Sequence, residues 1–328
     1  MITLRNILTL CLLLGVTILF AQKKNTFFLK NSGQYVSKLD SADFIRVVKE
    51  PAKGSKLYTV YEFYPKGQEK MEGTSTTIDP ISLDGTCISF YMNGKRKSIV
   101  DYKHNRVVGE VSLYFPNGTL NYTKFYGRAD SVDQDKNPLP QSVYIKACND
   151  STGKVLATNG EGYFVGYTTD FGKIAEEGKI KNGKPIGEWK GYEPIFKTKI
   201  LETYGDDGQL KTGLSVNSFG QRVSYYSRIV PPRYIGGMAA FNKFLSKNIG
   251  YPVVARTDRI QGIVMLMFLI GKDGSMKDVK VFRSVNDQVN AEAIRVLKLS
   301  DGSWLPGSVY GRAIDYPLTV PISLSLVN

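Results

Sequence analysis

An uninterrupted run of eight apolar residues, Ile263–Ile270, places the strongest constraint on how this chain can fold. Gly262 and Gly271 flank the run, so it is far shorter than the roughly 20 residues that span a bilayer. A short apolar run between glycines is typical of a central strand that is buried on both faces. The following Lys272–Ser275 segment contains Gly274, which tolerates the positive φ of a tight turn, so the chain is predicted to return as a second strand.

The end of the chain predicts a strand at the edge of this sheet. Apolar and polar residues alternate strictly from Leu318 to Leu326, which gives the strand one buried and one polar face. Pro321 has no N–H to donate, and it therefore confines the strand to an edge. The sheet partner is expected on the side of residues 318, 320, 322 and 324, so that the free edge keeps some donors for an incoming strand. The candidate partner-binding residues are Thr319, Pro321, Ser323 and Ser325.

Two helices are predicted to cover the sheet. Apolar residues in 237–247 have the i, i+3, i+4 spacing of one helix face, and Gly250 and Pro252 disfavour its continuation. A second apolar stripe follows Asp287, which is a plausible N-cap. Residues 229–328 are thus predicted to form a small α+β domain with an antiparallel three-stranded sheet and two helices.

Several short motifs in this region resemble those of the C-terminal domain of TonB, in the same order and with similar spacing. The residues that carry the resemblance include Tyr234, Gly236, Gly237, Tyr251, Pro252, Gly262, Asp273, Gly274, Trp304, Pro306 and Gly307.

The resemblance implies a non-enzymatic periplasmic domain that grips outer-membrane transporters of Gram-negative bacteria. It implies that the grip forms by strand addition to a short extended segment, without a cofactor. The chain departs from the family in having no clear anchor helix and no Pro-rich spacer, both of which a force-transmitting member needs. The leading hypothesis is therefore a cell-envelope protein that binds a transporter or another envelope partner and contacts the membrane only through that partner.

Two further hypotheses stay open. In the first, an uncleaved N-terminus anchors the chain in the inner membrane, and the protein is an energy transducer that uses its repeats as a spacer. In the second, an aromatic ribbon that includes Trp189 and Tyr192 binds a glycan or peptide, and the C-terminal domain forms a homodimer.

The N-terminus follows the pattern of a secretory signal peptide at residues 1–21. Arg5 supplies the positive charge, an apolar core extends from Ile7 to Phe20, and Ala21 is a plausible cleavage point. The pattern predicts export to the periplasm, with residues 22–57 as a lead-in to the repeats.

Residues 58–128 and 143–228 read as two regions of β-hairpin repeats, joined by a polar linker at 129–142. The turn glycines Gly67, Gly94 and Gly118 follow one another at similar intervals, each after an aromatic strand. The pattern resembles MORN repeats, which implies a ribbon of antiparallel hairpins.

Charge and cysteine content bear on the possible partners of the protein and on its disulfide bonding. The net charge of +13 is spread along the chain, whereas nucleic-acid binding usually shows a clustered basic face, so no nucleic-acid partner is expected. In an oxidising compartment Cys87 and Cys148 form either a disulfide or two separate buried thiols.

No catalytic or metal site is predicted. The single histidine, His104, lies in a polar turn without a nucleophile motif, and one histidine with so few cysteines does not make a zinc site. The paired carboxylates at 176–177 and 206–207 read as turn charges, because adjacent residues on a strand would face opposite ways.

Overall fold

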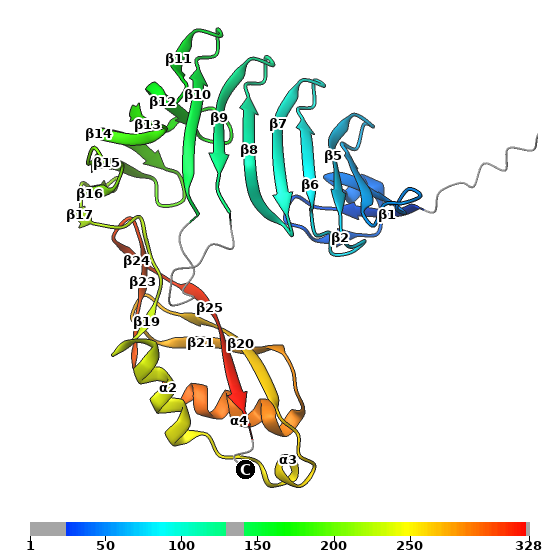
Figure 1. The fold of residues 1–328 in the computed structure, drawn as a ribbon, viewed down its shortest axis with the longest axis vertical. Helices are drawn as coiled ribbons and strands as arrows, with labels where there is room; N and C mark the ends of the chain where they lie inside the picture. The colour runs from blue at the N-terminus through cyan, green and yellow to red at the C-terminus, as the bar shows by residue number, and fades with distance from the viewer. Residues whose placement is uncertain (1–23, 129–140, 326–328) are drawn as a thin grey trace, which may run out of the picture. The chain divides into compact units, whose positions relative to one another are not determined.

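A computed structural model describes residues 24–128 and 141–325. The predicted signal peptide, Leu326 and most of the predicted linker lie outside these residues. The chain forms two compact units, Met1–Glu161 and Gly162–Asn328. Strands β1 to β17 belong to one 17-stranded sheet, and a smaller α+β domain follows (Figure 1).

The first unit is built from antiparallel strands that mostly pair with their neighbours in sequence. Its elements are β1 (Lys24–Leu29), β2 (Tyr35–Val36), the 3-10 helix η1 (Leu39–Ser41), β3 (Phe44–Lys49), β4 (Tyr58–Phe63), β5 (Glu69–Ser75), β6 (Gly85–Phe90), β7 (Arg96–Lys103), β8 (Arg106–Tyr114), β9 (Leu120–Tyr126), β10 (Val143–Asn149) and β11 (Val155–Thr158).

The predicted linker does not divide the sheet, because β9 and β10 pair across it, with Tyr126 opposite Val143.

The turn glycines that revealed the repeat close the same kind of turn. Gly67 has a φ of +90° and donates its N–H to the carbonyl of Tyr64 at 2.8 Å. Gly94 and Gly118 also have positive φ and donate to the residue three positions earlier. A left-handed backbone at this position is cheap only for glycine. The predicted hairpins are therefore present, while their assignment to the MORN family stays a prediction.

In two of these three turns, the aromatic residue that opens the turn is a tyrosine that also bonds to the next hairpin. The Tyr64 hydroxyl donates to the carbonyl of Phe90 at 3.0 Å, and the Tyr91 hydroxyl donates to the carbonyl of Tyr114 at 2.7 Å. These bonds satisfy polar groups at the two turns, whereas the third turn opens with Phe115, which has no hydroxyl.

The two cysteines are separate buried thiols, not the disulfide that the sequence left open. Cys87 lies in β6 and Cys148 in β10. Burial, reinforced by the charge of Glu62, raises the pKa of Cys87 to about 11.

The second unit continues the sheet and ends in the α+β domain. Its sheet strands are β12 (Glu161–Tyr167), β13 (Ile174–Lys181), β14 (Lys184–Glu193), β15 (Thr198–Tyr204), β16 (Leu210–Val216) and β17 (Arg222–Tyr225). The domain contains β18 (Ile229–Val230), β19 (Arg233–Tyr234), α2 (Gly237–Asn248), α3 (Val253–Thr257), β20 (Gly262–Ile270), β21 (Met276–Arg283), α4 (Asp287–Lys298), β22 (Trp304–Leu305), β23 (Gly307–Val309), β24 (Arg312–Ile314) and β25 (Tyr316–Leu324).

The predicted three-stranded sheet is present, in the order β21–β20–β25, and all its pairs are antiparallel. Helices α2 and α4 contribute to one core against it (Figure 1). The count of two helices was too low, since the short α3 places Ala255 in this core. The N-cap of α4 is Asn286 and not Asp287, because the Asn286 side chain accepts the N–H of Val289 at 2.8 Å.

The prediction that β20 is buried on both faces was wrong. Its core face, which includes Leu266 and Phe268, is at most 1% exposed, whereas Ile263 is 53% and Met267 38% exposed on the other face. Residues of α2, α3 and α4 all pack into this one core, while the outer row of β20 stays partly exposed. Uninterrupted hydrophobicity therefore overstated the burial of this strand.

Trp189 is the packing centre of the last sheet strands. Its ring lies 5.9 Å from the rings of Phe164 and Tyr204, and its indole N–H donates to the Lys179 carbonyl at 2.9 Å. The neighbouring Gly178 leaves room for the ring, because a Cβ there would approach the ring atoms to 2.4 Å.

We expect Gly178→Ala to destabilise the protein by about 1–3 kcal/mol, because the added methyl group overpacks the site of the Trp189 ring. Urea denaturation followed by Trp fluorescence measures the change. Gly250→Ala is the matched control, since its Cβ would meet the nearest atom at an ordinary 3.4 Å. Equal midpoints for the two variants would contradict the packing role of Gly178.

The thiol state of Cys87 and Cys148 is tested by titration with a disulfide reagent in the absence of reductant. Because both thiols are buried and the pKa of Cys87 is raised, we expect the folded protein to react at least about tenfold more slowly than a free thiol. Denatured protein lacking residues 1–21 should release two thiols, and Cys87→Ser should release one. A disulfide would leave none.

Candidate partner-binding site

β25 is an edge strand of the three-stranded sheet. Within the described residues it pairs with β20 alone, and the register sets Met265 opposite Pro321 and Leu266 opposite Val320. Pro321 has no N–H, so Met265 and Pro321 form a pair without mutual hydrogen bonds. Hydrogen bonding to β20 then uses the alternate residues of β25, in agreement with the predicted side for the sheet partner.

The free edge of β25 offers more acceptors than donors. By the same alternation, the carbonyls of residues 317, 319, 321 and 323 point away from β20. The accompanying N–H groups belong only to Thr319 and Ser323, since the other two residues are prolines. Ser325 lies just beyond the last residue of the strand. An incoming strand can therefore donate at four positions and accept at two.

The two faces of β25 differ as the alternation predicts. Val320 and Ile322 are 7% and 0% exposed in the core, while Thr319, Pro321 and Ser323 are exposed. On the exposed face these small residues adjoin the partly exposed apolar row of β20, residues 263, 265, 267 and 269. This apolar surface was not predicted, because the uninterrupted apolar run indicated that these residues were buried.

Aromatic motif residues build the domain core and not its edge. The Trp304 ring lies 5.5 Å from Tyr234, 5.2 Å from Phe241 and 5.5 Å from Phe268. Tyr251 donates its hydroxyl to the carbonyl of Ile260.

The glycine, proline and aspartate motifs also have structural positions. Gly236 and Gly237 have positive φ at the start of α2, and Pro252 is the N-cap of α3. Asp273 accepts the N–H of Ser275 in the predicted turn at 3.0 Å.

Three further glycines of the motif lie where a side chain would not fit without movement. A Cβ at Gly274 would lie 2.5 Å from the Trp304 carbonyl oxygen, and one at Gly262 would lie 2.8 Å from Val285. At Gly307, which follows Pro306, a Cβ would lie 2.8 Å from both Pro232 and Tyr316. The motif thus specifies the fold of the domain, and the residues of the free edge are a separate set.

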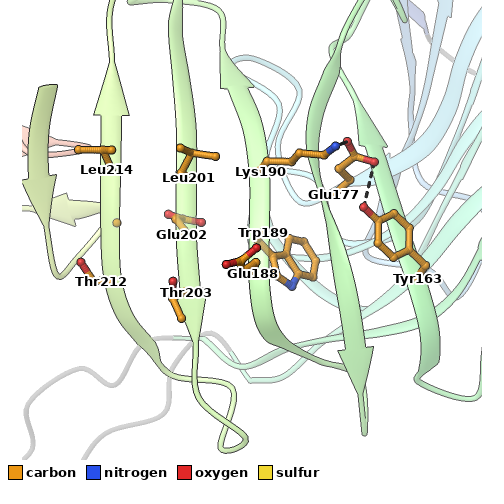
Figure 2. Close-up of a pocket in the computed structure, with 11 residues that line it drawn as sticks. Tyr163, Glu177, Glu188, Trp189, Lys190, Leu201, Glu202, Thr203, Thr212 and Leu214 are labelled. Carbon is orange, nitrogen blue, oxygen red and sulfur yellow. Dashed lines mark hydrogen bonds and ion pairs between the residues drawn. The ribbon is translucent and has the colours of Figure 1, made fainter. Parts of the chain in front are cut away.

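A second candidate surface is a hollow of about 480 Å³ over β12 to β16 (Figure 2). Glu177 accepts the hydroxyl of Tyr163 at 3.1 Å and pairs with Lys190 at 3.2 Å, and Leu201 beside them is 50% exposed. Trp189 borders the hollow, but it is only 4% exposed, and its ring packs against Phe164 and Tyr204. It is therefore a core residue with no open ring face on which a sugar could stack.

Tyr192, the other aromatic of the ribbon hypothesis, is partly buried, and the Lys173 ammonium lies 3.8 Å from its ring centroid. His104 is a surface residue of the β7–β8 turn, with Nδ1 3.3 Å from Asp84 and a side chain that is 69% exposed.

Among residues 24–128 and 141–325, no three His, Cys, Asp or Glu side chains are grouped to hold a metal. None of the helices in these ranges is long and apolar enough to cross a membrane.

Comparison with known proteins shows which family the C-terminal domain is similar to. Residues 247–326 match the family model of the Gram-negative bacterial TonB protein C-terminal. One NMR solution structure of the Helicobacter pylori TonB-CTD is 27% identical, with a TM-score of 0.23, and covers 27% of this chain and 91% of its own. A second such structure is 25% identical, with a TM-score of 0.22, and covers 28% of this chain and 81% of its own. No match was found among curated proteins.

The resemblance drawn from the sequence motifs is therefore confirmed for the last part of the chain. Residues 247–326 are similar to the C-terminal domain of Gram-negative TonB proteins.

Proposed function

We propose that the C-terminal domain binds an extended segment of an outer-membrane transporter, or of another envelope protein, by adding it to the free edge of β25. The observation that carries the proposal is the position of β25 at the end of its sheet, with the N–H groups of Thr319 and Ser323 directed outward. Likeness to the TonB C-terminal domain supports the choice of partner.

The proposed mechanism is non-covalent binding with no catalytic step. A segment in β conformation donates its backbone N–H groups to the outward carbonyls of β25 and accepts the two outward N–H groups. Alternate side chains of the segment lie on the exposed face, near the apolar row of β20. The segment must have N–H groups where it faces β25, so proline is tolerated in it only at every second position.

We propose that the protein acts in the periplasm or cell envelope of a Gram-negative bacterium, in transport that depends on TonB, without a cofactor. The strands β1 to β17 precede the C-terminal domain in the sequence, where force-transmitting relatives are expected to have a Pro-rich spacer. An inner-membrane anchor at residues 1–21 would make the protein an energy transducer.

The proposal is tested by capture of transporters from outer-membrane extracts with the mature protein. We expect the double variant Thr319→Pro, Ser323→Pro to lose at least about tenfold in affinity, because it removes both outward donors. Both changes have the same strand phase as Pro317 and Pro321, so the pairing with β20 is retained.

The matched control is Thr319→Ala, Ser323→Ala, which changes the same side chains and keeps both N–H groups. We expect it to capture the partner as the unmodified protein does. Circular dichroism and melting temperature verify that both variants fold. Undiminished capture by the folded proline variant would show that strand addition at this edge is wrong.

A further inference from the structure

A buried carboxylate holds together the segment that leads from the sheet to the C-terminal domain. The Glu202 side chain in β15 is 1% exposed. It accepts the Tyr225 hydroxyl at 2.8 Å, the Tyr204 hydroxyl at 2.9 Å and the Arg228 Nε–H at 2.9 Å. A buried charge with this many charge-assisted and neutral hydrogen bonds is costly to separate from its cation.

Arg228 lies between β17 and β18 and binds two carboxylates. Its Nε and Nη2 hold Glu202 in a bidentate contact, and its Nη1 lies 3.1 Å from Glu176 in β13. Burial alone would lower the pKa of Arg228, but the bond to Glu202 and the charges of Glu176 and Glu202 outweigh it and raise the pKa. The guanidinium therefore stays charged and joins β13, β15 and the segment after β17.

The hairpin β23–β24 contacts the same place. Tyr310 at its tip donates its N–H to the Arg228 carbonyl at 2.7 Å, and its ring lies 5.7 Å from that of Tyr225. Arg312 donates to the carbonyl of Gln221 at 3.0 Å. The contact is close, because a Cβ at Gly311 would lie 2.8 Å from Val223 in β17.

This hairpin lies next to β25 in the chain. β24 ends at Ile314 and β25 begins at Tyr316, with Asp315 as the only residue between them. Asp315 accepts the N–H of Lys272 at 3.0 Å, which ties this junction to the β20–β21 turn. A displacement of β25 along its axis therefore pulls on a hairpin that packs against β17 and is bonded to Arg228 and Gln221.

We propose that the Arg228 cluster, which comprises Arg228, Glu202, Glu176, Tyr225 and Tyr310, fastens the hairpin at the base of β25 to the last strands of the sheet. A pull on a segment bound at β25 then passes through the hairpin into β13, β15 and β17, as well as along the chain through residues 231–262. This mechanical role rests on the proposed function, whereas the fastening itself does not. Strands β13, β15 and β17 then share the load that is applied to the binding strand.

Hydrogen exchange of the full mature chain tests the fastening. In Arg228→Gln we expect peptides that contain β17 and residues 307–314 to exchange at least about tenfold faster, since Glu202 loses its cation. Arg222→Gln, an exposed arginine on β17, is the matched control and should leave these rates unchanged. Unchanged exchange in Arg228→Gln would overturn the proposal.

Faster exchange throughout the chain would mean that Arg228→Gln destabilises the whole protein. In that case the experiment is repeated with Arg228→Lys, because lysine keeps the charge and loses the bidentate contact. We expect faster exchange confined to the same peptides, and its absence there would overturn the fastening.

A pulling experiment on single molecules then tests the mechanical role. With handles at Asp206 and Ser325, the first extension event should occur at a lower force in Arg228→Gln than in Arg222→Gln. Equal forces in the two variants would overturn the proposed mechanical role of the Arg228 cluster. Capture of the extended segment should be the same in both variants, so a failure of the proposed binding function is recognised separately.

Discussion

Each strand of a sheet has two rows of backbone polar groups, and every row that leaves water must find a partner. In this chain most rows are satisfied by the next strand in sequence, through hairpins whose turn glycines close the same bond. That arrangement needs no long-range crossovers and yields a long sheet from a modest repeat. At β25 the last three-stranded sheet ends, and prolines remove half of the outward donors. The edge is thereby blunted against indiscriminate pairing while it keeps a row of acceptors.

The buried charges of the second unit have a different role from the hairpins. Backbone bonding joins neighbouring strands, whereas Glu202 and Arg228 join segments that are 26 residues apart in sequence. The neighbouring carboxylates Glu176 and Glu177 illustrate the division. Glu176 points to Arg228, and Glu177 points to Tyr163 and Lys190 on the other face. One face of the sheet thus carries the fastening, and the other carries the open hollow.

The sequence was most informative where one periodicity dominated. The phase of β25, the helix after Gly237 and the turn at Lys272–Ser275 all followed from local patterns, and the structure has them. The opposite faces of Glu176 and Glu177 were also predicted, although they lie in β13 and not in a turn. The failure came where burial depends on what lies across the sheet, since the outer face of β20 is partly exposed. Of the two states that the sequence left open for the cysteines, the structure has two separate buried thiols. No sequence pattern indicated the Arg228 cluster, since the cluster depends on the register between distant strands, which no local pattern specifies.

The central claim is that a partner segment adds to β25, and amide exchange at single-residue resolution tests it most directly. NMR of the protein with and without the captured segment would follow Thr319 and Ser323 together with Val320 and Ile322. The account predicts that binding slows exchange at Thr319 and Ser323, while Val320 and Ile322, already bonded to β20, change little. Bound protein with unprotected Thr319 and Ser323 amides would contradict it.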